Sequence, residues 1–181
     1  MDADGNDIII LGNAFATSAE PGIVMVSRDA NQNGIADDRW YEIAGSEYAS
    51  STQNYEITYY RPEADKDTLK ELKEYIRWSD NQGNSGWVSK NATHLQGYYP
   101  AWIDADSLTF KGTLLPTNSI DKNGDGSYFE LKPYEWGYAD NQPNSNEAGC
   151  SIDLDWAVDD AGNAIELEAI DFIRIHTAIN A

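Results

Sequence analysis

The chain of 181 residues carries 31 acidic and 12 basic residues, a net charge of -19, with 41% hydrophobic and 12% aromatic content. This acidic balance argues against binding to nucleic acid or to an anionic membrane surface, because both need a positive patch. The single Cys150 excludes an internal disulfide, and no apolar run reaches the roughly 18 residues of a membrane span. We expect residues 1–6 to be a linker and residues 7–181 to form one ligand-binding domain, monomeric by default.

In chain order, short apolar or β-branched runs between Gly, Asn, Asp and Pro predict strands over residues 7–11, 22–27, 40–43 and 55–60. One helix is predicted after them. Thr68 and Glu71 have the spacing of a capping box. Leu69, Leu72 and Ile76 then fall on one side at helical spacing, among charged residues, so the predicted helix is short and lies on the surface.

The C-terminal region has the clearest strand pattern. Apolar and polar residues alternate over residues 152–158 and again over 165–169, with a turn-forming stretch at 159–163 between them, and residues 172–177 continue the second arm. The alternation predicts a long antiparallel hairpin with one face in water. Several strands without a βαβ rhythm predict an all-β fold, an antiparallel β-sandwich or jelly roll with one short surface helix and a calcium-type loop.

The calcium-type loop is predicted at residues 29–38. Oxygen-bearing side chains stand at loop positions 1, 3, 5, 9 and 10 with glycine at position 6, the layout of a loop that surrounds a hard cation. Position 12 is Trp40, where an EF-hand needs glutamate, so the ion would have a structural role. A turn without metal is the alternative, because Asp, Asn and Gly are common turn formers. The candidate calcium ligands are Asp29, Asn31, Asn33, Ile35, Asp37 and Asp38.

A second candidate cation loop begins at residue 121. Its oxygens stand at positions 1, 3 and 5, but no distal acidic ligands follow, so an ordinary turn is an equal alternative. The candidate ligands are Asp121, Asn123 and Asp125.

Aromatic residues gather in three other stretches. Residues 78–85 and 138–145 each place an aromatic residue before an Asx-rich turn, and such loops at one end of a sandwich commonly bind ligands. Residues 91–102 hold three large aromatic residues around a proline, too many for a solvated loop unless they pack inward or meet a flat ligand. Ordinary turns and inward packing are the alternatives.

The two histidines have different settings. Alternation over residues 172–177 places Ile173 and Ile175 on one face of a strand and Arg174 and His176 on the other. If the isoleucines face the core, His176 is exposed and available to a metal or cofactor, with a solvated strand residue as the alternative. His94 lies among aromatic residues, and we expect it to be buried and hydrogen-bonded.

Motifs for catalysis are missing from the sequence. There is no Gly-x-Ser-x-Gly, no Gly-rich phosphate loop and no His/Cys zinc cluster. The 31 acidic residues supply many carboxylate pairs, so glycoside hydrolysis stays open, but nothing singles out one pair. We therefore predict binding without catalysis and assign no catalytic residue.

A set of motifs extends over nearly the whole chain, at residues 20–24, 40–48, 59–62, 78–81, 98–100, 136–141 and 171–173. Together they resemble a domain of Bacteroidetes cell-surface lipoproteins, some of them encoded in cobalamin-uptake loci, whose BtuH-like members bind vitamin B12 beside the outer-membrane transporter. The charged residues 65–73 depart from that pattern.

The resemblance implies a surface-exposed domain of an outer-membrane lipoprotein that captures cobalamin or a related corrinoid for uptake. A corrin is a broad plate fringed by amides, so its site should offer aromatic faces and hydrogen bonds, and a histidine could bind the cobalt. We favour His176 over His94 for that role. The candidate ligand-binding residues are His176, His94, Arg174, Trp78, Asp80, Asn81, Tyr98, Tyr99, Trp102, Trp136, Tyr138, Asp140 and Asn141.

Two other functions fit the same sequence. A calcium-stabilised carbohydrate-binding module of a surface glycan-binding protein would also be a jelly roll with exposed Trp and Tyr, and only a histidine requirement would separate it from a cobalamin binder. A structural spacer in a larger surface protein would have no exposed aromatic cluster.

Overall fold

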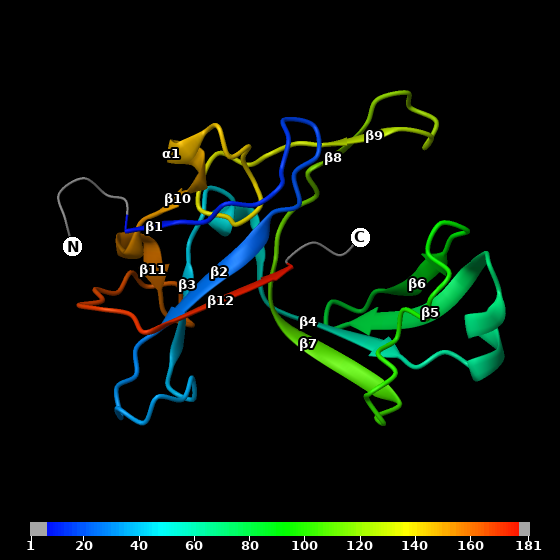
Figure 1. The fold of residues 1–181 in the computed structure, drawn as a ribbon, viewed down its shortest axis with the longest axis horizontal. Coiled ribbons are helices and arrows are strands. Elements are labelled where there is room, and N and C mark those ends of the chain that lie inside the picture. Colours follow the sequence, from blue (N-terminus) through cyan, green and yellow to red (C-terminus); the bar gives the residue numbers. More distant parts are fainter. Residues whose placement is uncertain (1–6, 178–181) are drawn as a thin grey trace. The chain divides into compact units, whose positions relative to one another are not determined.

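The computed structural model describes residues 7–177, and the contacts within the chain divide it into two compact units. Unit 1 combines the chain up to Ser51 with the chain from Leu114 onward, and unit 2 is the continuous segment Thr52–Thr113 (Figure 1). The linker expected over residues 1–6 lies outside the described residues. That residues 7–181 form one ligand-binding domain stays a prediction.

Unit 1 is built on a four-stranded antiparallel sheet in the order β11-β3-β2-β12. The strands are β2 (Gly22–Ser27), β3 (Trp40–Ile43), β11 (Ala157–Val158) and β12 (Phe172–Thr177). Two small two-stranded sheets accompany it, one of β1 (Ile8–Ile9) and β10 (Ser151–Ile152), the other of β8 (Ser119–Asp121) and β9 (Phe129–Leu131). The only α-helix of the described residues is α1 (Glu147–Cys150), and 3-10 helices occupy Tyr48–Ser50 and Leu154–Trp156.

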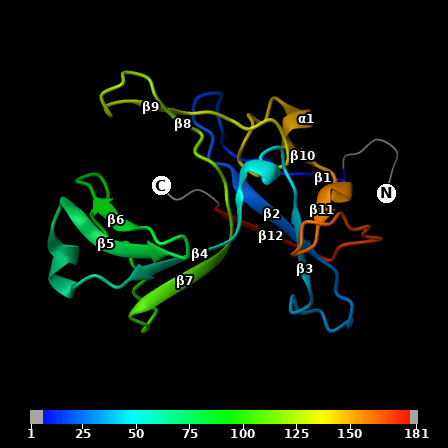
Figure 2. The same cartoon turned by 180° about the vertical axis from the view of Figure 1, so that it is seen from behind.

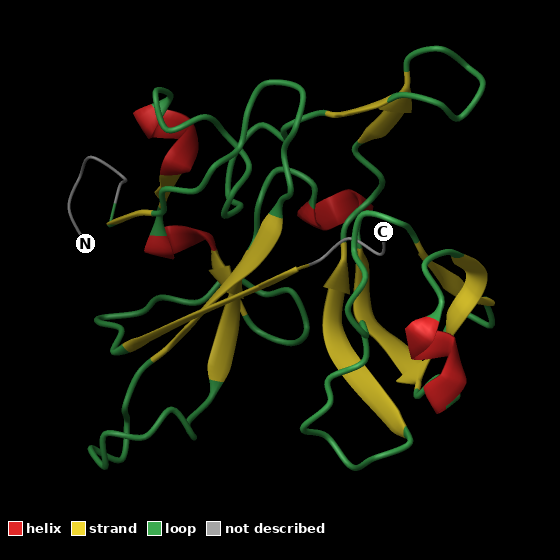
Figure 3. Ribbon diagram, turned by 45° about the vertical axis from the view of Figure 1, so that its right-hand side comes forward, coloured by secondary structure: helices red, strands yellow, loops and turns green. Residues whose placement is uncertain are grey.

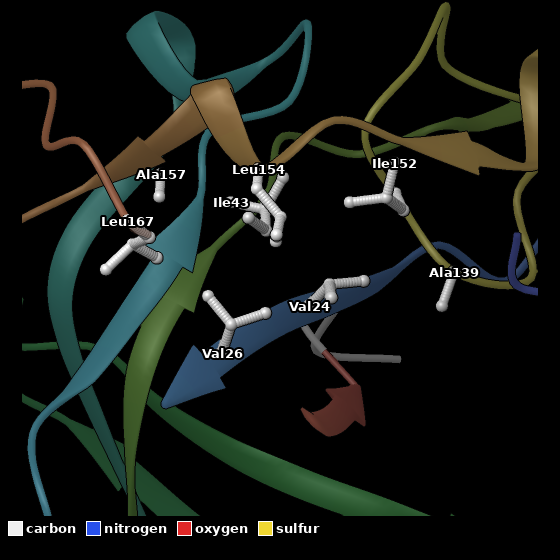
Figure 4. Close-up of a cluster of buried hydrophobic side chains, with 8 residues drawn as sticks. All are labelled: Val24, Val26, Ile43, Ala139, Ile152, Leu154, Ala157 and Leu167. Carbon is white, nitrogen blue, oxygen red and sulfur yellow. The ribbon is translucent and has the colours of Figure 1, made fainter. Parts of the chain in front are cut away.

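The main core of unit 1 lies on one face of β2, the near-continuously apolar strand at the centre of the sheet. Val24 and Val26 on this face are fully buried, and each such side chain contributes about 1.5–3 kcal/mol by leaving water. Ile23, on the opposite face, packs with Leu115 and Tyr138 in a second cluster. The larger cluster, drawn in Figure 4, consists of Val24, Val26, Ile43, Ala139, Ile152, Leu154, Ala157 and Leu167.

The C-terminal hairpin predicted from sequence is wrong. β12 pairs with β2, from Phe172 opposite Ser27 to Thr177 opposite Gly22, and β11 pairs with β3. A single bridge between Val158 and Ala164 closes the turn at residues 159–163. An alternating apolar and polar sequence indicates only that a strand has one buried face. It does not say which other strand pairs with it.

Unit 2 contains the second four-stranded sheet, in the order β6-β5-β4-β7 (Figure 2). The strands are β4 (Thr52–Tyr60), β5 (Leu72–Asp80), β6 (Ser85–Lys90) and β7 (Ser107–Leu114), with a 3-10 helix at Ala64–Thr68. The core of this unit is aromatic. Tyr75, Ile76 and Tyr99 are buried and pack with the partly buried Tyr59, Leu72, Val88, Tyr98 and Leu108.

The surface helix predicted over residues 68–76 is also wrong, because β5 begins at Leu72. A register shift between Leu72 and Ile76, where β5 pairs with β6, lets the consecutive residues Tyr75 and Ile76 both be buried. Pairing with β4 on one side and β6 on the other outweighs the helical spacing of three apolar residues.

The expected all-β class with antiparallel sheets is confirmed, and strands joined by long loops dominate the ribbon in Figure 3. One short α-helix is present among the described residues, but it is α1 and not the stretch predicted from sequence. Each unit contains one four-stranded sheet. The four consecutive strands β4 to β7 share one sheet, which differs from the interleaved strand order of a jelly roll.

Candidate functional site

Unit 2 contains a pocket of about 570 Å³. One wall comes from the chain after β4, with the 3-10 helix Ala64–Thr68, and the other from the loop between β6 and β7. Of the residues that line it, those with a polar group or a large ring are Arg61, Asp67, Gln96, Tyr98, Tyr99 and Trp102.

The loop that forms the second wall is ordered by its own hydrogen bonds. At its start, Oδ1 of Asn91 accepts the N–H groups of Thr93 (2.9 Å) and His94 (3.0 Å), which is an Asx turn. The Tyr98 hydroxyl then accepts the N–H of Asn91 and donates to the carbonyl of His94, both at 3.3 Å. Hydrogen bonds within residues 91–98 therefore fix the part of this loop that leads into the pocket.

Arg61 and Tyr99 join the two walls. The Tyr99 ring is 9% exposed, and its hydroxyl donates to the carbonyl of Ala105 (2.8 Å). The Arg61 guanidinium lies 4.8 Å from the centroid of that ring and donates to the same carbonyl (3.0 Å) and to that of Ile103. Trp102 lies in the same loop segment, between Tyr99 and Ile103, but its side chain is 85% exposed.

Asp67 is held on the first wall by two buried residues of the neighbouring strands. The Tyr75 hydroxyl donates to the Asp67 carboxylate and accepts the N–H of Tyr98 (3.3 Å). The Lys90 ammonium donates to the Asp67 carbonyl (2.6 Å) and lies 5.0 Å from the centroid of the Tyr75 ring. Burial, and secondarily the hydrogen bond to Asp67, raises the pKa of Tyr75 to about 12, so the hydroxyl keeps its proton at neutral pH.

Of the candidate binding residues, Tyr98, Tyr99 and Trp102 line this pocket, and His94 lies in the same loop. His94 is exposed, so its expected burial is wrong. Tyr98 and Tyr99 pack into the aromatic core of unit 2, whereas His94 lies in the turn that precedes them. Neighbours in sequence therefore have opposite environments.

Trp78, Asp80 and Asn81 belong to the β5–β6 hairpin and do not line the pocket. Oδ1 of Asp80 accepts the N–H groups of Gln82 (3.0 Å) and Asn84 (2.7 Å). Partial burial raises the pKa of Asp80, but hydrogen bonds from Asn84, Tyr55 and Gln82 together lower it below its ordinary value. The side chains of this turn therefore form hydrogen bonds with backbone N–H groups of the turn itself.

Trp136, Tyr138, Asp140 and Asn141 lie in unit 1 and support its fold. The Asn141 amide accepts the N–H of Tyr134 (2.7 Å) and donates to the carbonyl of the same residue (2.9 Å). Oδ1 of Asp140 accepts the N–H of Asn13 (2.7 Å), and the ring of Trp136 lies 4.4 Å from that of Trp156. Tyr138 and Asn141 are 2% and 1% exposed, which leaves them no face for a ligand.

His176 and Arg174 lie on β12, also in unit 1. The predicted exposures are only partly correct: Arg174 is exposed as expected, but Ile173 and Ile175 are 46% and 49% exposed and His176 is half-buried. The two faces are as predicted, since the isoleucines stand opposite Val26 and Val24, but β12 is the last strand of its sheet. The Arg174 guanidinium lies 4.4 Å from the centroid of the Trp40 ring.

The predicted calcium loop at residues 29–38 turns its oxygens inward onto its own backbone. Oδ1 of Asp29 and Oδ1 of Asn31 both lie 3.0 Å from the N atom of Asn33, and Oδ2 of Asp29 lies 2.8 Å from that of Gly34, whose φ is 74°. The other candidates belong to the same network. Oδ1 of Asn33 accepts the N–H of Ile35 (2.7 Å), Asp37 accepts from the side-chain amides of Asn31 and Asn33 (3.2–3.3 Å), and Asp38 accepts the N–H of Ala30 (3.0 Å).

The second candidate loop joins β8 to β9. The Asp121 carboxylate accepts the N–H groups of Asn123 (3.2 Å), Gly124 (3.0 Å) and Gly126 (2.8 Å). Hydrogen bonds from Ser127 lower the pKa of Asp125. Within residues 7–177, no three His, Cys, Asp or Glu side chains are grouped as a metal site, so calcium at either loop would depend on Asn and backbone oxygens as well.

Arg61, Asp67 and Gln96 are pocket residues that the sequence did not identify. Arg61-Pro62 directly follows a predicted strand, which is a signal for a loop at a sheet edge, but Asp67 lies just before the stretch assigned to a surface helix, where nothing marked it as a binding residue. Neither known protein-family models nor curated proteins show a match to the chain. No helix of the described residues is long and apolar enough to span a membrane.

Proposed function

We propose that this protein is a non-catalytic, surface-exposed domain of an outer-membrane lipoprotein, which captures cobalamin or a related corrinoid at the pocket of unit 2 for uptake. The observation that carries the proposal is Trp102, which is 85% exposed at a pocket whose other aromatic residues are anchored. A large apolar side chain left in water forgoes about 3 kcal/mol of burial free energy. A flat ligand recovers that free energy when it covers the indole.

The groups around Trp102 match the chemistry of a corrinoid. Its peripheral amides both donate and accept hydrogen bonds, and the pocket presents a carboxylate acceptor on Asp67, guanidinium donors on Arg61 and an amide on Gln96. The volume of about 570 Å³ is in the range typical of small-molecule sites, roughly 300–1,000 Å³. His94 is exposed on the same loop, so an imidazole is available to cobalt there.

Carbohydrate binding is the second candidate, and the same Trp102 favours it. A sugar ring stacks on an exposed indole through its C–H face, while its hydroxyls bond to carboxylate, amide and guanidinium groups. Hydrolysis of such a ligand receives no support from the pocket. Of the described residues that line it, only Asp67 carries a carboxylate, and glycoside hydrolysis needs two.

The test is a titration of cyanocobalamin into the chain, followed by visible absorption and calorimetry. We expect Trp102→Ala to weaken binding at least 10-fold, and Trp87→Ala, a control on the exposed Trp of β6 outside the pocket, to leave it unchanged. Loss of the spectral change in His94→Ala would identify the cobalt ligand, whereas its loss in His176→Ala would assign cobalt binding to unit 1 and contradict capture at the unit 2 pocket. Absence of cyanocobalamin binding would contradict corrinoid capture, and binding of neutral oligosaccharides with the same Trp102 dependence would then support the second candidate.

Calcium as a structural ion is proposed for the loop at residues 29–38. The oxygens of Asp29 and Asn31 converge within 3.0 Å of one backbone N–H, and a carboxylate has lone pairs left after it accepts such bonds. At ten times its dissociation constant, calcium should raise the free energy of unfolding by about 1.4 kcal/mol. Thermal unfolding with calcium and with EDTA measures this, and Asp29→Asn should remove the difference. Equal melting temperatures would contradict the proposal.

A further inference from the structure

We propose that Asp67 determines the specificity of the unit 2 pocket, by selecting a ligand group that is neutral and donates a hydrogen bond, such as a primary amide or a hydroxyl, against an anionic group. This inference rests on the proposed function, because it names the chemistry of a ligand for the same pocket.

The first support is the unbalanced charge of Asp67. Within residues 7–177, no Lys or Arg side chain forms an ion pair with this carboxylate. The Lys90 ammonium is directed to the backbone carbonyl of Asp67, and the Tyr75 hydroxyl donates only to Oδ1. An ionised carboxylate accepts about four hydrogen bonds, so acceptor capacity is left on the side of the pocket.

The second support is the rigidity with which the carboxylate is held. Tyr75 is fully buried and Lys90 is 3% exposed, so neither can follow Asp67 into solvent. Tyr75 also accepts the N–H of Tyr98, which ties Asp67 to the opposite wall of the pocket. A group fixed in this way loses little conformational entropy when a ligand binds, and it cannot turn away from an unfavourable one.

The third support is the lack of a side chain at residue 97, directly beside the carboxylate. Gly97 lines the pocket beside Asp67, and a Cβ at residue 97 would lie 3.3 Å from Cγ, Oδ1 and Oδ2 of Asp67. Any side chain at residue 97 would therefore cover the group that a ligand has to reach.

Arg61 does not cancel this selectivity. Its guanidinium stacks on Tyr99, donates to the carbonyls of Ile103 and Ala105, and lies 3.9 Å from Asp106. Nη2 is thus engaged by the loop that Arg61 closes, and the ion pair with Asp106 offsets the charge of Arg61, whereas Asp67 has no such ion pair among the described residues; the other N–H groups of Arg61 stay available to a carbonyl of the ligand. The chain as a whole carries a net charge of -19, which adds to the repulsion of an anionic ligand.

The experiment compares matched neutral and acidic ligands by calorimetry. Cyanocobalamin is paired with its three isomeric monocarboxylic acids, in each of which one propionamide has become a carboxylate, and a neutral oligosaccharide is paired with its uronic acid counterpart. For the wild-type chain we expect at least one acid to bind 10-fold or more weakly than its neutral parent. In Asp67→Asn this preference should fall to less than 3-fold.

Asp65→Asn is the matched control, because Asp65 lies in the same 3-10 helix but does not line the pocket, and it should keep the wild-type preference. Tyr75→Phe removes the hydroxyl that fixes Asp67 and should weaken the neutral ligands at least 3-fold. Circular dichroism checks that each variant is folded. An Asp67→Asn preference equal to that of the wild type would overturn the inference and leave the proposed function standing. Failure of every neutral probe to bind the wild-type chain would overturn both.

Discussion

Residues 98–102 in unit 2 and residues 136–141 in unit 1 are similar in composition, since both place aromatic residues beside Pro or Gly and near Asx residues. In unit 1, Asn141 satisfies both backbone groups of Tyr134, and Tyr138 is buried. In unit 2, Tyr98 and Tyr99 close their own loop, and Trp102 stays 85% exposed. Aromatic content therefore does not identify a binding surface, and what distinguishes the two is where the surrounding hydrogen bonds are directed.

Gly137 gives the largest expected effect within this comparison. Its φ is 91°, and a Cβ there would lie 2.4 Å from Cα of Gly45, a backbone atom that cannot give way. We expect Gly137→Ala to lower the free energy of unfolding by about 4 kcal/mol, through backbone strain and overlap together. Urea unfolding followed by circular dichroism measures this loss.

Gly97→Ala is the counterpart of Gly137→Ala in unit 2. A Cβ at residue 97 would lie 3.3 Å from a side-chain carboxylate, whereas a Cβ at residue 137 would meet a backbone atom. We therefore expect Gly97→Ala to lower the free energy of unfolding by less than about 1 kcal/mol. Its main effect should be weaker ligand binding. A Gly97→Ala chain as unstable as Gly137→Ala would show that both segments are structural and would remove the distinction.

Equivalent asparagines of the two aromatic-plus-Asx segments, residues 78–85 and 138–145, give the next effect. Asn141 is 1% exposed, and Asn141→Ala would leave the N–H and carbonyl of Tyr134 without their partner. We expect a loss of about 3 kcal/mol, since an unsatisfied buried group costs about 1–3 kcal/mol.

Asn81 makes the equivalent pair of bonds, to Glu56 (3.1 Å) and Asn54 (2.8 Å), but it is exposed. Water can replace the lost partner, so Asn81→Ala should cost about 1 kcal/mol. Equal losses for the two variants in urea unfolding would contradict the difference in environment.

High pH gives the smallest effect and acts on both units. Burial is the main cause that raises the pKa of Tyr75 in unit 2 and of Tyr134 in unit 1, each to about 12. Above pH 10 the unfolded chain loses these protons while the folded chain keeps them, so the stability present below pH 10 is lost progressively as pH rises toward 12. Tyr75→Phe should make the decline between pH 10 and pH 12 shallower. A decline as steep as that of the wild type would contradict burial as its cause.

Single strands were predictable where the sequence has a property that needs no partner. The apolar run at residues 22–27 is β2, the central strand of its sheet, because a strand buried on both faces has to be apolar throughout. The Asx loop at residues 29–38 likewise forms from local hydrogen bonds between close neighbours. The helix prediction for residues 68–76 was wrong because strand pairing, which involves distant residues, outweighs the helical spacing of only three apolar residues.

The candidate site was predictable only in part. Tyr98, Tyr99 and Trp102 stood out by their aromatic density, but nothing local marks Arg61 or Asp67 as binding residues, and they meet that loop only through the fold. The predicted exposure of His176 depended on the isoleucines being covered, and the position of β12 at the edge of its sheet leaves them partly open.

The sequence by itself determined the all-β class, the positions of the Asx turns and the supply of aromatic residues, because these depend on residue type and on neighbours a few positions apart. Only the tertiary structure decided which strands pair, which aromatic residues stay exposed, and which polar groups face the pocket. Those outcomes depend on contacts between residues tens of positions apart, such as Tyr75 with Tyr98, or Gly137 with Gly45. Burial is a property of such contacts, and no local pattern records it.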